Sequence, residues 1–80
     1  MEINEIIRGL REDREPKTTQ GDVAKVLNTT QRKISRIETG EAEPNSEDLR
    51  MLCKFYNVSA DYILGLPCNL PYPERYNNND

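Results

Sequence analysis

One short stretch of the chain, TTQRKISRIETG, gathers side chains that can bind phosphates and bases. Residues 29–40 hold three cations and one anion, although the whole chain of 80 residues carries a net charge of -3. Guanidinium groups can make paired hydrogen bonds to guanine, and a Gln amide can do the same to adenine. The segment is therefore suited to recognition of a nucleic acid, and its alternative reading is an ordinary solvated helix face. The polar side chains concerned are Gln31, Arg32, Lys33 and Arg36.

Residue types typical of catalytic and metal sites are scarce. The chain contains no His, the commonest general base and the commonest metal ligand. Its two cysteines, Cys53 and Cys68, are too few for a metal site, and we expect them to be free thiols. No paired-carboxylate cleft or phosphate-binding loop is evident. We therefore expect no enzymatic activity, no metal and no cofactor.

Two further classes are disfavoured by the composition. Trp is absent and aromatic residues are 6% of the chain, which argues against a protein that stacks single-stranded bases. The N-terminal sequence MEINEIIRG is acidic and lacks a long apolar run, so we expect neither a secretory signal nor a membrane segment. The expected location is the cytoplasm.

Charge is segregated along the chain, which makes the net charge a poor guide to its partners. Residues 17–37 carry five cations against one anion, whereas residues 38–48 carry five anions and no cation. A phosphate backbone would meet the local charge of the first segment.

Apolar spacing predicts an all-α chain of five short helices, because no segment alternates well enough to be a strand. The expected ranges are 2–14, 20–27, 30–38, a helix ending at Asn57, and 60–64. Every helix after the first follows a residue that can accept a hydrogen bond from the first turn. These capping residues are Thr19, Thr30, Asn45 and Ser59.

The second and third predicted helices are joined by a very short turn, an arrangement typical of a helix-turn-helix. Ala24 is small where the two helices must approach closely, and Asn28 tolerates the left-handed conformation that such a turn needs. Apolar residues on both helices supply a shared seam, namely Val23, Leu27, Ile34 and Ile37. Any pair of antiparallel helices shows some of these features.

The chain resembles the XRE/Cro-type, phage-repressor-like helix-turn-helix regulators. The resemblance covers about residues 6–65 and is carried by LRED, TQGDVAKVLNTTQRKISRIETG and PNSEDLRMLCKFYNVSADYILG. It implies a compact five-helix domain that binds double-stranded DNA sequence-specifically, with residues 30–38 as the recognition helix in the major groove. It further implies a homodimer on a palindromic operator, and we expect a repressor.

The resemblance also assigns roles to individual residues. The base-reading positions would be Gln31, Arg32, Lys33 and Arg36. Contacts to the DNA backbone are expected from Gln20, Thr29, Ser35 and Lys17. Glu38 is expected to pair with Arg11 of the first helix in a structural role, while Ile34, Ile37 and Cys53 are expected in the core.

Two segments depart from the family pattern. The connection REPKTT is about two residues longer than usual, and it places Lys17 and Thr18 where an apolar residue often sits. The loop GEAEPNSED is acidic where many relatives are basic. We therefore expect few phosphate contacts from this loop and a modest nonspecific affinity.

We expect one domain over residues 1–66 and a Pro/Asn-rich tail over residues 67–80. Leu70, Tyr72 and Tyr76 of the tail would pack either on their own domain or on a second subunit. A dimer surface is expected at Tyr62, Ile63, Leu66 and the tail tyrosines, although these residues could equally finish the core. An alternative function is an antitoxin or other interaction module whose fold binds a protein partner, such as a toxin or an antirepressor.

Overall fold

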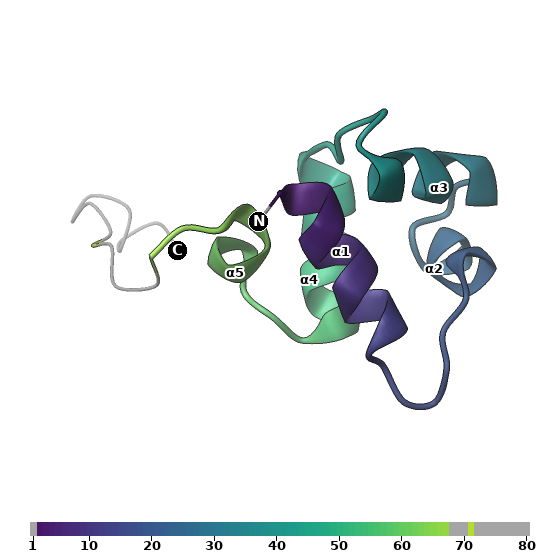
Figure 1. Cartoon of the computed structure of the whole chain (residues 1–80), viewed down its shortest axis with the longest axis horizontal. Coiled ribbons are helices and arrows are strands. Elements are labelled where there is room, and N and C mark those ends of the chain that lie inside the picture. Colours follow the sequence, from purple (N-terminus) through teal and green to yellow (C-terminus); the bar gives the residue numbers. More distant parts are fainter. Residues whose placement is uncertain (1, 68–70, 72–80) are drawn as a thin grey trace.

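The computed structural model describes residues 2–67 and 71, and in these residues α-helices are the only regular secondary structure. Its helices are α1 (Ile3–Glu12), α2 (Gln20–Val26), α3 (Gln31–Thr39), α4 (Ser46–Tyr56) and α5 (Ala60–Leu64) (Figure 1). The predicted fold class, five short helices with a helix-turn-helix, is confirmed. The predicted tail residues Cys68, Leu70, Tyr72 and Tyr76 lie outside the described residues.

Local capping sets where most helices begin and end. Thr19 and Asp22 cap α2 reciprocally, with each side chain accepting the backbone N–H of the other. Thr30 accepts from the backbone N–H of Lys33 at the start of α3, and Gly40 ends that helix at φ 87°. These short-range signals explain why the sequence placed the helices well.

Helix α1 ends two residues earlier than expected. It stops at Glu12, and the Arg14 side chain turns away to donate from Nη1 to the carbonyl of Phe55 at 2.7 Å. Pro16 disfavours a helical conformation at Glu15, so α1 is not expected to continue through that residue.

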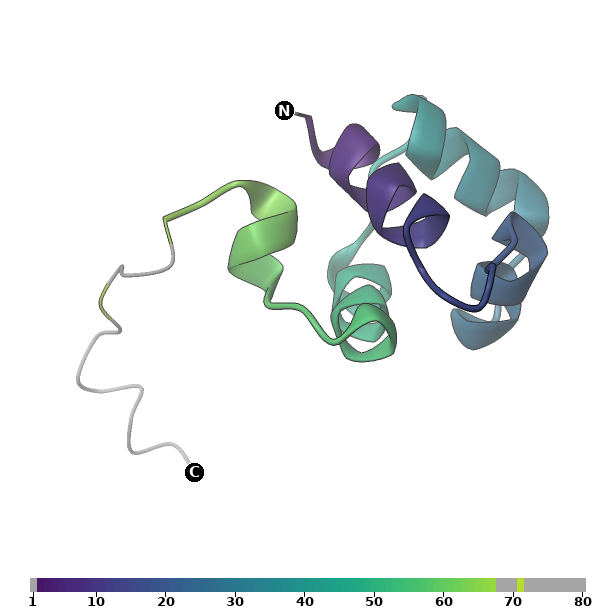
Figure 2. The same ribbon diagram turned by 60° about the horizontal axis from the view of Figure 1, so that its bottom comes forward.

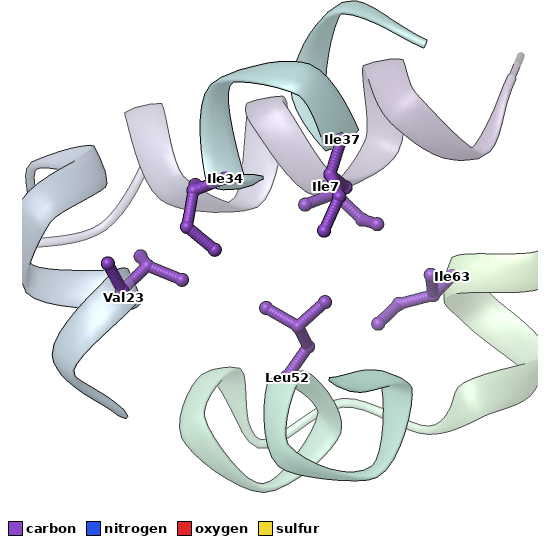
Figure 3. Packing of buried hydrophobic residues seen from close by; sticks show 7 residues of the cluster. Ile7, Val23, Ile34, Ile37, Leu52 and Ile63 are labelled. Atoms are coloured by element: carbon purple, nitrogen blue, oxygen red, sulfur yellow. The ribbon is translucent and has the colours of Figure 1, made fainter. Parts of the chain in front are cut away.

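The core draws buried apolar side chains from every helix (Figure 3). Its members are Ile7, Val23, Ala24, Ile34, Ile37, Leu52 and Ile63. Ile63 is fully buried, so of the two roles considered for it, core and dimer surface, the structure gives the core. Cys53, expected in the core, is half-buried: it packs against the edge of the core cluster and also lines a surface groove beside α4.

The helices α2 and α3 lie together at one end of the molecule, and α5 lies at the other end in both views (Figures 1 and 2). Helix α3 packs mainly on α1 and α2, whereas α5 packs on α1 and α4. Within the described ranges, no helix has the length and apolar character needed to cross a membrane.

Candidate nucleic-acid interface

The turn between α2 and α3 brings these helices into close contact. Asn28 takes the left-handed conformation at φ 55°, and the backbone N–H of Thr29 donates to the carbonyl of Ala24 at 2.9 Å. Ala24 itself is buried where the helices approach. A larger side chain at this position would push the helices apart, so the small residue and the positive φ together define the helix-turn-helix geometry.

Helix α3 has a buried face and an exposed face. Ile34, Ile37 and Glu38 are buried against the rest of the domain. Gln31, Arg32 and Arg36 are exposed, while Lys33 and Ser35 are half-buried. A helix with one anchored face and one row of exposed polar side chains can enter the DNA major groove.

The buried carboxylate of Glu38 anchors α3 to two neighbouring helices. Arg11 of α1 donates from Nε to Oε2 at 2.7 Å and from Nη2 to Oε1 at 3.0 Å. Gln20 of α2 donates from Nε2 to Oε1 at 3.1 Å. The hydrogen-bonded Glu38 carboxylate raises the pKa of Arg11 above its usual value. The charge of Glu38 is therefore paired and hydrogen-bonded, as a buried charge requires.

The hydrogen-bond network of Glu38 continues to the exposed face. Gln31 donates from Nε2 to Oε1 of Gln20 over a long 3.4 Å contact. Gln20 thus accepts from the start of α3 with its carbonyl oxygen and donates to Glu38 near the end of α3 with its amide. The third Arg11 donor, Nη1, bonds the carbonyl of Thr18 at 3.2 Å and ties the connection before α2 to the same network.

The cations of α3 differ in their partners. Lys33 Nζ lies 3.0 Å from Oδ2 of Asp48, at the start of α4. Arg36 Nε lies 3.8 Å from Oε1 of Glu41, and both of these side chains are exposed. Arg32 is exposed and forms no ion pair with another residue of the described chain. The loop after α3 and the first turn of α4 therefore each provide a partner for one of the three cations.

The remaining predicted DNA-backbone residues are spread around the helix-turn-helix. Thr29 is half-buried in the turn, Ser35 is half-buried on α3, and Lys17 is exposed on the connection between α1 and α2.

Within residues 2–67 and 71, no group of His, Cys, Asp and Glu residues could hold a metal ion.

Sequence reasoning missed Asp48 and Glu41 as partners of α3. The sequence does place Asp48 three residues after the cap residue Asn45, as in a capping box, and the structure shows that box. Its second role, accepting Lys33, depends on how α4 is placed beside α3, and no local signal reports that placement.

Comparison with known proteins supports the helix-turn-helix assignment. A helix-turn-helix family model matches residues 3–63. The HTH-type transcriptional activator BcrR of Enterococcus faecalis is 36% identical over 64 residues, which cover 80% of this chain. The matched region spans 30% of the length of BcrR.

Solved structures show the same arrangement of helices. The P22 c2 repressor protein in complex with the synthetic operator 9T superposes with a TM-score of 0.72 at 34% identity, covering 80% of this chain and 94% of that one. The solution structure of the P22 c2 DNA-binding domain gives a TM-score of 0.70 at 32% identity, covering 79% and 80%. A transcriptional regulator from Listeria innocua shares the fold alone, with a TM-score of 0.75 at 20% identity over 95% of this chain and 69% of that one.

The turn geometry, the anchored α3 and the family match over most of the chain lead to the same assignment. The chain belongs to the XRE/Cro-type, phage-repressor-like family of helix-turn-helix transcriptional regulators.

Proposed function

We propose that this protein binds double-stranded DNA sequence-specifically and reads the major groove with α3. The observation that carries the proposal is the exposed row of Gln31, Arg32 and Arg36 on a helix whose opposite face is fixed by Ile34 and Ile37. Gln31 would pair with adenine, and the two arginines with guanine. Lys33, the fourth predicted base reader, is paired with Asp48 and is not part of this proposal.

Contacts to the phosphate backbone would position the domain on the duplex. The proposed donors lie on α2, in the turn, on α3 and in the connection before α2, namely Gln20, Thr29, Ser35 and Lys17. Glu41 and Asp48 form ion pairs with two of the three α3 cations, so the electrostatic attraction of α3 to unrelated DNA should be modest. Because the proposed function requires access to DNA, the proposed location is the cytoplasm.

We further propose repression as the mode of regulation. The support for repression is that two solved structures similar to this chain, at 34% and 32% identity, are of the P22 c2 repressor, one of them in complex with an operator.

A homodimer would explain the exposed apolar residues at the end opposite α3. Tyr62, Leu64 and Leu66 are the large hydrophobic side chains that remain exposed in the described part of the chain. Two copies joined through α5 would present two recognition helices to half-sites about 34 Å apart. Nothing in the described residues favours the alternative of a protein-binding antitoxin module.

The proposal can be tested by selecting binding sites from a random duplex library and titrating the selected duplex in mobility-shift assays. We expect one palindromic consensus, and we expect Gln31→Ala and Arg36→Ala each to lose about 5- to 150-fold of the preference for it, which corresponds to about 1–3 kcal/mol. Arg50→Ala removes an exposed cation of α4 and serves as the control. Equal affinity for every sequence, unchanged by the α3 substitutions, would refute the proposal.

A further inference from the structure

We propose that Lys33 is a positioning residue whose ion pair with Asp48 fixes α3 against the start of α4, and that it does not contact the DNA bases. The inference rests on the proposed function, because it concerns how the recognition helix is presented to the groove. It separates Lys33 from the three other predicted base-reading residues of α3, which are exposed.

The carboxylate of Asp48 is held in place by the cap of its own helix, independently of Lys33. Its side chain is 8% exposed, and its Oδ2 accepts the backbone N–H of Asn45 at 3.3 Å. The backbone N–H of Asp48 in turn donates to Oδ1 of Asn45 at 2.8 Å. Asp48 is therefore immobilised by the α4 capping box, and the flexible Lys33 side chain, 37% exposed, extends to it.

This ion pair supplies a contact that apolar packing does not. Helix α3 packs mainly on α1 and α2, and its link to α4 runs through Leu52 in the shared core and through the loop after Gly40 (Figure 3). Apolar contacts are non-directional, whereas an ion pair between two defined atoms adds a directional constraint on the rotation of the helix. An ion pair with a buried carboxylate fixes relative orientation more than it adds stability.

Two ion pairs then define the axis of the recognition helix. Lys33 ties its first turn to α4, and Glu38 ties its last turns to Arg11 of α1. The two attachment points are separated by about 7.5 Å along the helix at 1.5 Å per residue. Removing one leaves the apolar packing of α3 with a single ion pair to direct it, and we expect this to change the angle at which Arg32 and Arg36 are presented.

The attachment can be measured without DNA by a double-substitution cycle. Lys33→Gln removes the cation, and Asp48→Asn removes the charge while keeping an oxygen for the N–H of Asn45. We expect the effects of the two substitutions on the unfolding equilibrium constant, measured in urea, to fall short of additivity by about threefold or more, because they remove the same contact. Additive effects would show that the two side chains do not interact measurably in the folded protein, and this result would overturn the proposal.

Binding to the selected operator separates a positioning residue from a DNA contact. Each cation that neutralises a phosphate contributes about 0.9 to the slope of log affinity against log salt concentration. We expect Arg32→Gln to reduce this slope and Lys33→Gln to leave it unchanged, while Lys33→Gln still weakens operator binding by about threefold or more through the altered helix angle. A slope that falls equally in both variants would overturn the proposal.

The same double-substitution cycle on operator affinity completes the test. If Lys33→Gln weakens operator binding by breaking its pair with Asp48, adding Asp48→Asn should cause little further loss, because the pair is already broken. If Lys33 instead contacts the DNA, the effects of the two substitutions on operator affinity should add, and that result would overturn the proposal. If the wild-type protein selected no sequence, the proposed function would fail, and the urea cycle would still decide whether the ion pair holds α3.

Discussion

Arg11 and Glu38 form a two-point ion pair across the contact between α1 and α3, with donor–acceptor distances of 2.7 and 3.0 Å. The carboxylate is almost completely buried, and Gln20 adds a further hydrogen bond to it. Geometry of this kind fixes both the distance and the rotation of one helix relative to the other.

Removing one member of this pair should be strongly destabilising. Arg11→Met leaves a buried carboxylate with only Gln20 as a neutral partner, and we expect a loss of about 3–5 kcal/mol in the free energy of unfolding, measured in urea. Arg8→Met, on the same helix, breaks the exposed Arg8–Glu12 pair and should cost about 0.5 kcal/mol or less. Similar losses in the two variants would contradict this interpretation.

The acidic loop should restrain the affinity for unrelated DNA through Arg36. Glu41→Gln frees that guanidinium from its carboxylate, so we expect tighter binding to an unrelated duplex at low salt. Glu43→Gln removes the same charge from the same loop, and Glu43 forms no ion pair within the described ranges. An exposed pair is worth about 0–1 kcal/mol, so the Glu41 variant should exceed the Glu43 variant by up to about fivefold.

Salt provides the check on the Glu41 prediction. The difference between the two variants should shrink as salt screens the exposed charges, over a Debye length of about 10 Å at 0.1 M. A difference that persisted unchanged at high salt, or equal effects of Glu41→Gln and Glu43→Gln, would show that Glu41 does not compete with DNA for Arg36.

Tyr56 should make stability fall at high pH. Its hydroxyl is buried and has no hydrogen-bond partner in the described chain, and burial raises the pKa of Tyr56 from 10.0 to about 12. The neutral form is favoured in the folded state, so this contribution is intact below pH 10 and is lost as the pH rises toward 12.

The measurement is the free energy of unfolding of wild type and Tyr56→Phe at several pH values. At neutral pH we expect the variant to equal or slightly exceed the wild type, because a buried hydroxyl without a partner is removed. Between pH 10 and 12 the variant should lose less stability than the wild type. Tyr62→Phe, at an exposed position, serves as the control, and parallel pH profiles of Tyr56→Phe and the wild type would refute the assignment.

Asn28 should be replaceable by Gly but not by Ala. Its backbone has φ 55°, a conformation that costs a residue with a Cβ about 1–2 kcal/mol. We expect Asn28→Ala to lower the free energy of unfolding. The free energy of unfolding of Asn28→Gly should stay near that of the wild type. Equal stability of the two variants in urea would mean that the turn is not constrained in this way.

The sequence predicted the helices well because their signals are local. Thr19, Thr30, Asn45 and Ser59 cap their helices through bonds that span three residues, and Gly40 ends α3 in the left-handed conformation. The end of α1 was placed too late because the contact that draws Arg14 away is made with Phe55, far along the chain.

The site was less predictable, because the partners of its charges come from distant segments. The neighbouring residues Tyr62 and Ile63 differ completely in burial, and a five-residue helix is too short for its buried face to be read from periodicity. The expected Arg11–Glu38 pair came from the family resemblance and not from spacing. The pairing of Lys33 with Asp48 requires the three-dimensional placement of α4, which no repeat of apolar residues reveals.

The unequal attachment of the α3 side chains has a consequence for changing the DNA preference of this domain. Arg32 is exposed without an ion pair in the described chain, and Arg36 has only a weak exposed one. Under the proposed function, exchanging either of these residues would change the base preference and leave the contacts between helices intact. Lys33 pairs with Asp48 of α4, and Gln31 has a long contact with Gln20 of α2, so exchanges there would also change a contact between helices. Retargeting by variation or by protein engineering is therefore expected to be most accessible at two of the four predicted base-reading positions.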